Sequence, residues 1–332
     1  MAIVEQEREL VSRLPFGEQL AEWSGRLGTI LVVGILFAIF SLTADNFATV
    51  QNIQNIGRQI AITAILAVGM TMVIIIGGID LSVGSVVLFS AAVMNSLIFN
   101  QVLPTGPAIL AGILSAMAVG LINGVLVERV GISPVIVTLG SMITFRGLGQ
   151  MILWINNSWL WVTDPVFKYI KTISWFYVPI PAVIMLILYL AAAILMGKTI
   201  FGRQVYAIGN NQRAAWLSGS PVIKTKVLVY VLSGFCAGIG GILMGARLGA
   251  ISPGVGQGLE FEAITAVVLG GTRLAGGVGR VERTLLGAII VGMVLNYMTI
   301  MGISAHYQRA VTGFIILGAA LLDQISRGRE RA

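Results

Sequence analysis

The sequence predicts an all-α polytopic membrane protein with about ten transmembrane helices, an internal repeat, and broken or re-entrant segments. Hydrophobic residues make up 57% of the 332 residues and charged residues only 11%, against about 25% charged in an ordinary soluble domain. A helix needs roughly 20 apolar residues to cross a hydrocarbon core of about 30 Å. The chain can therefore hold about ten crossings, and little is left for a soluble domain.

Ten apolar segments define the expected helices in order along the chain, and the eighth of them is short. The segments lie near residues 27–43, 57–77, 85–100, 107–127, 134–152, 179–197, 227–249, 259–271, 284–302 and 306–323. This order places one tail at 1–26 and a second at 326–332. Between them we expect a membrane domain at 27–325, with a polar loop at 198–226.

The distribution of charge predicts the orientation of the chain. The first 26 residues carry five glutamates and three arginines, and the next apolar segment has no A-x-A-like cleavage site, so we expect a cytoplasmic tail rather than a signal peptide. With the amino terminus inside, 15 of the 21 Lys and Arg residues fall on cytoplasmic segments, as the positive-inside rule requires. Both termini are then cytoplasmic. The net charge of +7 forms no basic stripe with interleaved aromatic residues, which argues against nucleic acid as a partner.

The chain lacks the residues of common catalytic and metal sites. Its one cysteine, Cys236, and one histidine, His306, exclude an intrachain disulfide and a metal site built from these residue types. The stretch AAAILMGKT (191–199) ends like a phosphate-binding loop, but Ala192 replaces the first glycine and the stretch continues an apolar helix. We therefore predict no catalytic residues, no metal and no bound cofactor, and any ATP hydrolysis must belong to a partner.

A lone carboxylate, Asp80, interrupts the apolar stretch TMVIIIGGIDLSVGSVV (71–87). An aspartate near the centre of a membrane helix costs roughly 2.5–3.5 kcal/mol on insertion scales, and each glycine of the Gly77-Gly78 pair costs about 1 kcal/mol relative to Ala. Irregular backbone at membrane depth is tolerated only inside protein or beside a water-filled cavity. We expect a break in the helix, with Asp80, Ser82 and Ser85 facing a polar interior. The alternative is a tight turn at the membrane surface in which Asp80 caps a helix that begins near Leu81.

Other ionisable residues lie in apolar surroundings at Arg146, Arg247 and Glu262. Each of them either forms a salt bridge that locks two helices or lines a pathway.

The glycine-rich stretch also has an internal echo, because VIIIGGIDLSVG (73–84) and AVVLGGTRLAGG (266–277) share a glycine pair and the spacing of the residues after it. Repeated halves of this kind often build a midplane site in transporters. Counting helices places both copies at the same membrane face.

The polar loop at 198–226 contains the stretch NNQRAAWLSG (210–219), which predicts a short helix. Asn210 or Asn211 can cap its beginning, and Gly219 can end it. A helix of about two turns is unstable alone in water. It needs support from the membrane domain above it or from a partner below it.

Four motifs in this order resemble the permease subunit of a bacterial ABC sugar importer, in the ribose, galactose, arabinose and xylose group related to branched-chain amino acid permeases. The resemblance covers about residues 27–325, which would be the transmembrane permease domain. Its motifs are GMTMVIIIGGIDLSVGS, ISPVIVTLGSMITFRGL, GRQVYAIGNNQRAAWLSG and FEAITAVVLGGTRLAGGVGR.

The resemblance implies a transmembrane permease that works by alternating access in the bacterial inner membrane, among lipid. Its partners would be a cytoplasmic ABC ATPase that uses ATP and Mg²⁺, a periplasmic sugar-binding protein, and a second permease subunit. The loop at 198–226 would be the cytoplasmic coupling loop, and the residues matching the family pattern for ATPase coupling are Gly209, Asn210, Asn211, Ala214, Ala215, Ser218 and Gly219. We expect Ala215 and Gly219, one turn apart, to leave room for side chains of the ATPase. The residues we expect at the translocation path or gate are Gly77, Gly78, Asp80, Ser82, Gly84, Arg146 and Glu262.

One departure from the family pattern follows the last motif. Glu282 and Arg283 stand where an aliphatic residue and a glycine are expected, so close packing at the start of that helix is in question.

The competing function is an ion-coupled secondary transporter, in which Asp80 or Glu262 would carry the coupling ion. Such a protein would transport without an ATPase and would need no docking helix.

Overall fold

The computed structural model describes residues 16–330, with side chains described at 28–318 and at 321. The predicted amino-terminal tail lies outside the described residues up to 15, and residues 331–332 of the second tail lie outside them as well. The helices are α2 (Phe16–Thr43), α3 (Val50–Ile75), α4 (Val83–Phe99), α5 (Thr105–Glu128), α6 (Pro134–Ile155), α7 (Pro165–Thr172), α8 (Ile180–Lys198), α9 (Ile200–Asn210), α10 (Gln212–Leu217), α11 (Val222–Leu248), α12 (Leu259–Leu269), α13 (Val281–Ile300) and α14 (Ala305–Glu330). Four two-residue strands complete the described fold: β1 (Leu160–Trp161), β2 (Ser174–Trp175), β3 (Val178–Pro179) and β4 (Ala250–Ile251).

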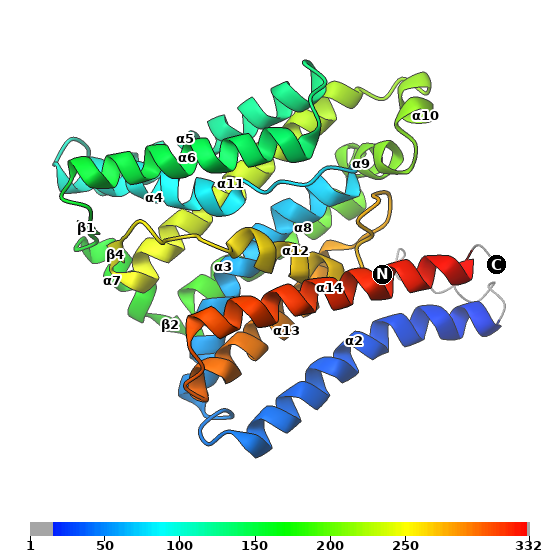
Figure 1. Cartoon of the computed structure of the whole chain (residues 1–332), viewed down its shortest axis with the longest axis horizontal. Coiled ribbons are helices and arrows are strands. Elements are labelled where there is room, and N and C mark those ends of the chain that lie inside the picture. Colours follow the sequence, from blue (N-terminus) through cyan, green and yellow to red (C-terminus); the bar gives the residue numbers. More distant parts are fainter. Residues whose placement is uncertain (1–15, 331–332) are drawn as a thin grey trace.

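The long helices form one bundle with two distinct ends (Figure 1). We call them the α10 end, which carries α9 and α10, and the β1 end, which carries α7 and the strands. Antiparallel pairing of β1 with β4 and of β2 with β3 ties the connections together at the β1 end. In Figure 1, α2 begins and α14 ends on the side of the α10 end.

Helix α3 lies at the centre of the bundle. Its most apolar 18-residue window is 89% buried, whereas the corresponding window of α6 is 22% buried. Helix α11 packs against α3, α4 and α5, and small residues make the contact with α5 close. A Cβ at Gly120 would collide with the Tyr230 carbonyl on α11, and a Cβ at Gly234 would collide with the Ala116 carbonyl on α5. Gly120 has a second glycine four residues further on, at Gly124, and Gly234 has one at Gly238. Small residues at this spacing let helices approach closely, and such packing drives helix association in lipid.

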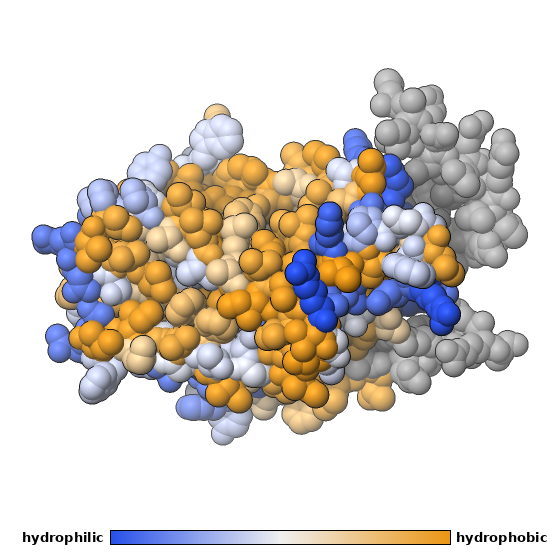
Figure 2. Space-filling view, turned by 90° about the horizontal axis from the view of Figure 1, so that it is seen from above, coloured by the Kyte–Doolittle hydropathy of each residue, from blue (hydrophilic) through white to orange (hydrophobic). Residues whose placement is uncertain are grey.

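The outer surface is apolar, as membrane helices require. Figure 2 shows hydrophobic residues over much of the visible face, with hydrophilic residues gathered toward the two ends. Six helices are long and apolar enough to cross a membrane, namely α3, α5, α6, α8, α11 and α13. Two shorter apolar helices occupy Gly28–Thr43 and Val83–Phe99. This composition fits a multi-pass membrane protein.

Each of the ten predicted apolar segments falls on a helix, but ten full crossings remain a prediction. Helix α12 has 11 residues, so it is about 16 Å long at 1.5 Å per residue and spans half of a hydrocarbon core of about 30 Å. Helix α2 begins at Phe16, inside the predicted tail. The sequence prediction missed α7 and α9, because both are too short and polar to give a membrane signal.

Close packing survives at the start of α13, where Glu282 and Arg283 depart from the family pattern. Gly270, at the end of α12, lies in close contact with the first turn of α13, because a Cβ at Gly270 would lie 2.7 Å from the Thr284 Cα. The side chain of Glu282 is exposed and takes no part in this contact. Close backbone packing at this point is therefore present together with Glu282 and Arg283.

Candidate functional site

The predicted break lies between α3 and α4. Helix α3 ends at Ile75, and the next residues turn where Gly77 adopts a positive φ of 81°, a conformation that glycine reaches without steric cost. Helix α4 begins at Val83 rather than near Leu81. Asp80 Oδ1 accepts hydrogen bonds from the Ser82 amide at 3.0 Å and from the Ser82 hydroxyl at 2.6 Å. Asp80 therefore fixes the turn that precedes the helix.

Asp80 is also the centre of a hydrogen-bond network that joins the break to three helices. The Ser233 hydroxyl on α11 donates to Asp80 Oδ2 at 2.8 Å. The Asn123 amide on α5 donates to the Ser82 hydroxyl at 3.0 Å, and the Ser141 hydroxyl on α6 donates to Asn123 Oδ1. Asp80 is 2% exposed. Its polar surroundings are thus protein groups, as we predicted for a break inside the bundle.

The two copies of the glycine-rich echo meet at the α10 end. The Gly277 amide donates to the Ile75 carbonyl at 2.8 Å. Gly209, at the end of α9, lies against both groups, and a Cβ there would collide with the Ile75 carbonyl. This contact confirms that both copies lie on the same side of the bundle. It also brings the predicted coupling loop against the break between α3 and α4.

A second contact holds α9 against the segment between α12 and α13. The Tyr206 hydroxyl on α9 donates to the Gly279 carbonyl at 2.9 Å. Burial and the nearby negative charge of Glu282 raise the pKa of Tyr206, against a smaller opposing effect of Arg280. The phenol therefore stays protonated, and able to donate, at neutral pH.

Helix α12 begins beside the first turn of α4 and carries Glu260. This residue is 5% exposed, and its Oε2 has no hydrogen-bond partner in the described part of the chain. A Cβ at Gly84 would collide with the Glu260 carboxylate and with the Gly256 carbonyl, so α4 and the segment before α12 touch backbone to backbone. The sequence prediction missed Glu260, because an acidic residue in a first helical turn is ordinarily explained by the helix dipole.

Arg146 on α6 reaches toward the same place. Its Nε donates to the Ser85 hydroxyl at 3.1 Å and its Nη1 to the Val255 carbonyl at 3.3 Å. Its Nη2 is buried without a partner among the described residues, and its charge interacts with that of Glu260. Arg146 thus joins α6 and α4 to the segment before α12 through hydrogen bonds.

Glu262, two residues further along α12, borders a polar cavity of about 360 Å³. Its Oε2 accepts a hydrogen bond from the Thr63 hydroxyl on α3 at 2.8 Å. Arg247 on α11 lines the same cavity, and its charge interacts with that of Glu262. Of the predicted path residues, Glu262 lines this cavity, whereas Asp80 does not.

The short helix predicted in the polar loop is α10. Asn211 is its N-cap, because its Oδ1 accepts a hydrogen bond from the Ala214 amide at 3.0 Å, and Gly219 follows its end with a φ of 84°. Asn210, which we considered as the alternative cap, ends α9. Its side chain donates to the Tyr206 carbonyl at 3.0 Å.

The predicted docking space at Ala215 is wrong. Ala215 is 4% exposed and packs inward against Ile208 and Val222, because the loop folds α10 back onto α9 and the start of α11. The exposed apolar residues of α10 are Trp216 and Leu217, at 66% and 71% exposure. Ala214, Ser218 and Gly219 are exposed as well.

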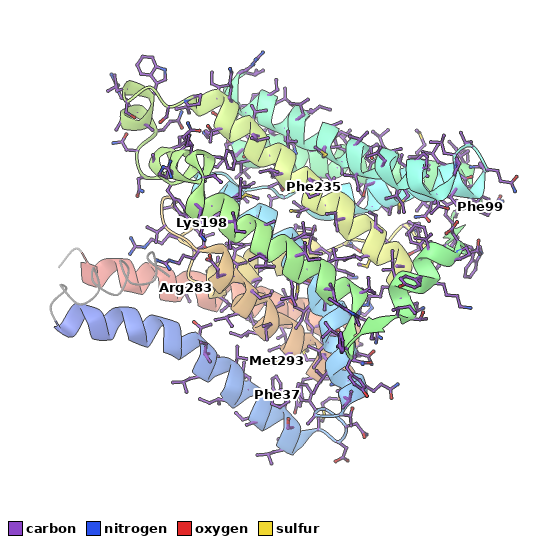
Figure 3. The ribbon with its side chains drawn as sticks, turned by 180° about the vertical axis from the view of Figure 1, so that it is seen from behind. Phe37, Phe99, Lys198, Phe235, Arg283 and Met293 are labelled. Carbon is purple, nitrogen blue, oxygen red and sulfur yellow. The ribbon has the colours of Figure 1, made fainter. Side chains whose placement is uncertain are left out.

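Lys226 joins α10 to the bundle through a hydrogen bond and also forms an ion pair between α11 and α5. Lys226 Nζ on α11 lies 2.5 Å from Glu128 Oε1 on α5 and donates to Gln212 Oε1 on α10 at 3.2 Å. Figure 3 shows Lys198, which ends α8, and Arg283, in the first turn of α13, on the side of the bundle from which α10 projects. The α10 end is therefore rich in basic residues.

Comparison with known proteins gives a consistent result. The model of one family, described as the permease component of branched-chain amino acid transport systems, matches residues 52–320. The ribose import permease of Bacillus subtilis is 40% identical over 299 residues, which cover 90% of this chain and 92% of that protein. An L-arabinose ABC transporter permease of Azospirillum brasilense is 36% identical over 92% of this chain and 90% of its own length. The D-allose transport system permease of Escherichia coli is 35% identical over 90% of this chain and 92% of its own.

Proposed function

Because this chain belongs to the family of permease components of branched-chain amino acid transport systems, we propose that it is the transmembrane permease of an ATP-driven, binding-protein-dependent importer for a monosaccharide or related polyol. Its relatives are named for ribose, L-arabinose and D-allose. They are transport subunits rather than enzymes, and this chain is one as well. Nothing in the comparisons favours the ion-coupled alternative.

The chain is a multi-pass protein of the bacterial inner membrane, and its orientation follows from the proposed partners. The α10 end faces the cytoplasm, where a cytoplasmic ABC ATPase binds and hydrolyses ATP with Mg²⁺. The β1 end receives solute from a periplasmic binding protein. A second permease subunit completes the membrane assembly. With this orientation both termini are cytoplasmic, in agreement with the positive-inside rule.

The observation that carries the proposal is the position of α10. Trp216 and Leu217 are exposed on a six-residue helix that is too short to be stable alone in water. They provide an apolar anchor for a cytoplasmic partner, and aromatic anchors are typical of binding hot spots. Gly209 behind them lies against the Ile75 carbonyl. A displacement of α10 by the ATPase that also moves α9 therefore reaches the break between α3 and α4 through Gly209.

The translocation path or gate is proposed at the break and at the start of α12. Its residues are Gly77, Gly78, Asp80, Ser82, Gly84, Arg146 and Glu262. Asp80 shapes this region by holding α11 and the turn before α4 together, and we do not expect it to bind solute tightly. Rocking of the two sides of the assembly would expose the path alternately to each membrane face.

The test is reconstitution of this chain in proteoliposomes with the ATPase and binding protein encoded beside it. We expect ATP-dependent uptake of radiolabelled D-ribose, L-arabinose or D-allose that requires all three components. Uptake by this chain alone, driven by a proton or sodium gradient, would overturn the proposal.

The coupling part of the proposal is tested by Leu217→Arg on α10. We expect ATPase binding to weaken by at least about tenfold, as at a binding hot spot, and uptake to fall with it. Val130→Arg is the matched control, because Val130 is 62% exposed in the connection between α5 and α6 at the same end of the bundle. Equal loss in both variants would show a general effect of added charge instead of docking through α10.

A further inference from the structure

The polar cavity bordered by Glu262 lies between α3, α11 and the segment that leads into α12. Its volume is about 360 Å³, within the roughly 300–1,000 Å³ of small-molecule pockets. Its polar lining residues are Gln59, Thr63, Arg247, Ser252, Gln257 and Glu262. No aromatic residue is among those that line it.

These polar side chains have hydrogen-bonding capacity that the protein leaves unused. Glu262 accepts one hydrogen bond, from Thr63, and a carboxylate can accept about four. The side chains of Gln59, Arg247 and Gln257 make no hydrogen bond within the part of the chain that the structure describes. A guanidinium group and two amides together offer many N–H donors and two further oxygen acceptors. The cavity therefore presents both donors and acceptors to whatever enters it.

The cavity shares lining residues with two larger hollows. Gln59 and Arg247 also line a cavity of about 710 Å³ at the β1 end, beside α7. Gln257 and Glu262 also line an apolar groove of about 900 Å³ between α12 and α14. The smaller polar cavity thus lies beside a space at the β1 end and beside the groove along α12.

We infer that this cavity is a transient binding site for one neutral polyhydroxylated solute, held by Gln59, Arg247, Gln257 and Glu262. The opposite charges of Arg247 and Glu262 offset one another, which suits a neutral solute better than an ion. Neighbouring hydroxyls of a sugar both donate and accept, and this lining offers partners for both. The absence of an aromatic platform removes a large source of contact area, so binding is weak and release is fast. This inference rests on the proposed function, because it names where the imported solute stops.

Cysteine labelling in the assembled importer tests the site without relying on transport rates. The chain has one cysteine, Cys236, which is buried, so Gln257→Cys in a Cys236→Ala background adds one reactive thiol. We expect a membrane-impermeant thiosulfonate reagent to modify it, several-fold more slowly with solute-loaded binding protein present. The solute is whichever of D-ribose, L-arabinose and D-allose the wild-type importer takes up. Gln51→Cys is the matched control on α3, because Gln51 is exposed outside the cavity, and solute should not protect it.

Uptake by cavity variants gives a second measurement. Gln59→Leu and Arg247→Met each remove hydrogen bonds to the solute and should lower uptake roughly three- to tenfold, with ATPase binding unchanged. Arg247→Lys should restore part of the loss, because it keeps the charge and some donors. Gln51→Leu should transport like the wild type.

The outcomes separate this inference from the proposed function. Equal labelling of Gln257→Cys with and without solute, or no labelling, in an importer that transports would overturn the cavity site alone. Wild-type complexes that take up no monosaccharide or polyol would overturn the proposed function and the cavity site with it.

Discussion

Two buried carboxylates lie beside the first turn of α4, and their surroundings differ. Asp80 is 2% exposed and accepts three hydrogen bonds, two from Ser82 and one from Ser233. Glu260 is 5% exposed, and its Oε2 has no partner among the described residues. Burial alone therefore does not reveal what a membrane carboxylate does. Asp80 accepts a hydrogen bond on each of its oxygens and joins helices, whereas Glu260 leaves one oxygen without a partner among the described residues.

Asp80→Ala gives the largest expected loss of stability. It removes the acceptor of three hydrogen bonds and leaves the donors of Ser82 and Ser233 buried, so the free energy of unfolding in detergent should fall by about 3 kcal/mol. Chemical denaturation followed by tryptophan fluorescence measures it. Asp80→Asn keeps one acceptor oxygen and should lose about half as much. A loss no greater than that of Glu260→Gln would remove the distinction between the two carboxylates.

Gly84→Ala tests the contact that brings the two regions together. The added methyl group collides with the Gly256 carbonyl and the Glu260 carboxylate, and we expect a loss of about 2 kcal/mol from overpacking. The control is Gly106→Ala in the first turn of α5, where a Cβ meets nothing within 4 Å and a small gain is expected. Equal stability of the two variants in the same denaturation experiment would show that α4 can shift away from α12.

Ser233→Ala isolates one arm of the Asp80 network. It removes the hydrogen bond to Asp80 Oδ2 and should cost about 1 kcal/mol. The double variant with Asp80→Ala should be no less stable than Asp80→Ala alone, because the two residues act through one hydrogen bond. Additive losses in this double-mutant cycle would mean that Ser233 stabilises α11 in another way.

Glu260→Gln gives the smallest expected effect on stability. The Oε2 atom that it replaces makes no hydrogen bond in the described structure, and the new side chain has nearly the same shape. We expect the free energy of unfolding to change by less than about 0.5 kcal/mol. Thermal unfolding of Glu260→Gln and Asp80→Asn compares the stability lost in the two amide substitutions. An equal loss of stability in both variants would show that Glu260 belongs to a structural network of its own.

Local signals predicted the break and α10, whereas partners distant in sequence could not be predicted. The Gly77-Gly78 pair and the isolated Asp80 lie within a few residues of one another, so the sequence predicts the break between α3 and α4 from local residues alone. Ser233 lies 153 positions from Asp80, and no pattern in one sequence pairs them. The inward face of Ala215 was misjudged for the same reason, because the residues beneath it come from the elements on either side of α10.

The contact of Gly209 with Ile75 and Gly277 has a mechanical consequence. Its groups are main-chain atoms on every side, and peptide planes do not change rotamer as side chains do. A displacement of α10 that was transmitted through a long side chain such as Lys226 would be reduced, because the side chain can rotate about its own bonds. Under the proposed coupling, a displacement passed through touching backbones loses little of its amplitude, so we expect the break between α3 and α4 to move when α9 moves.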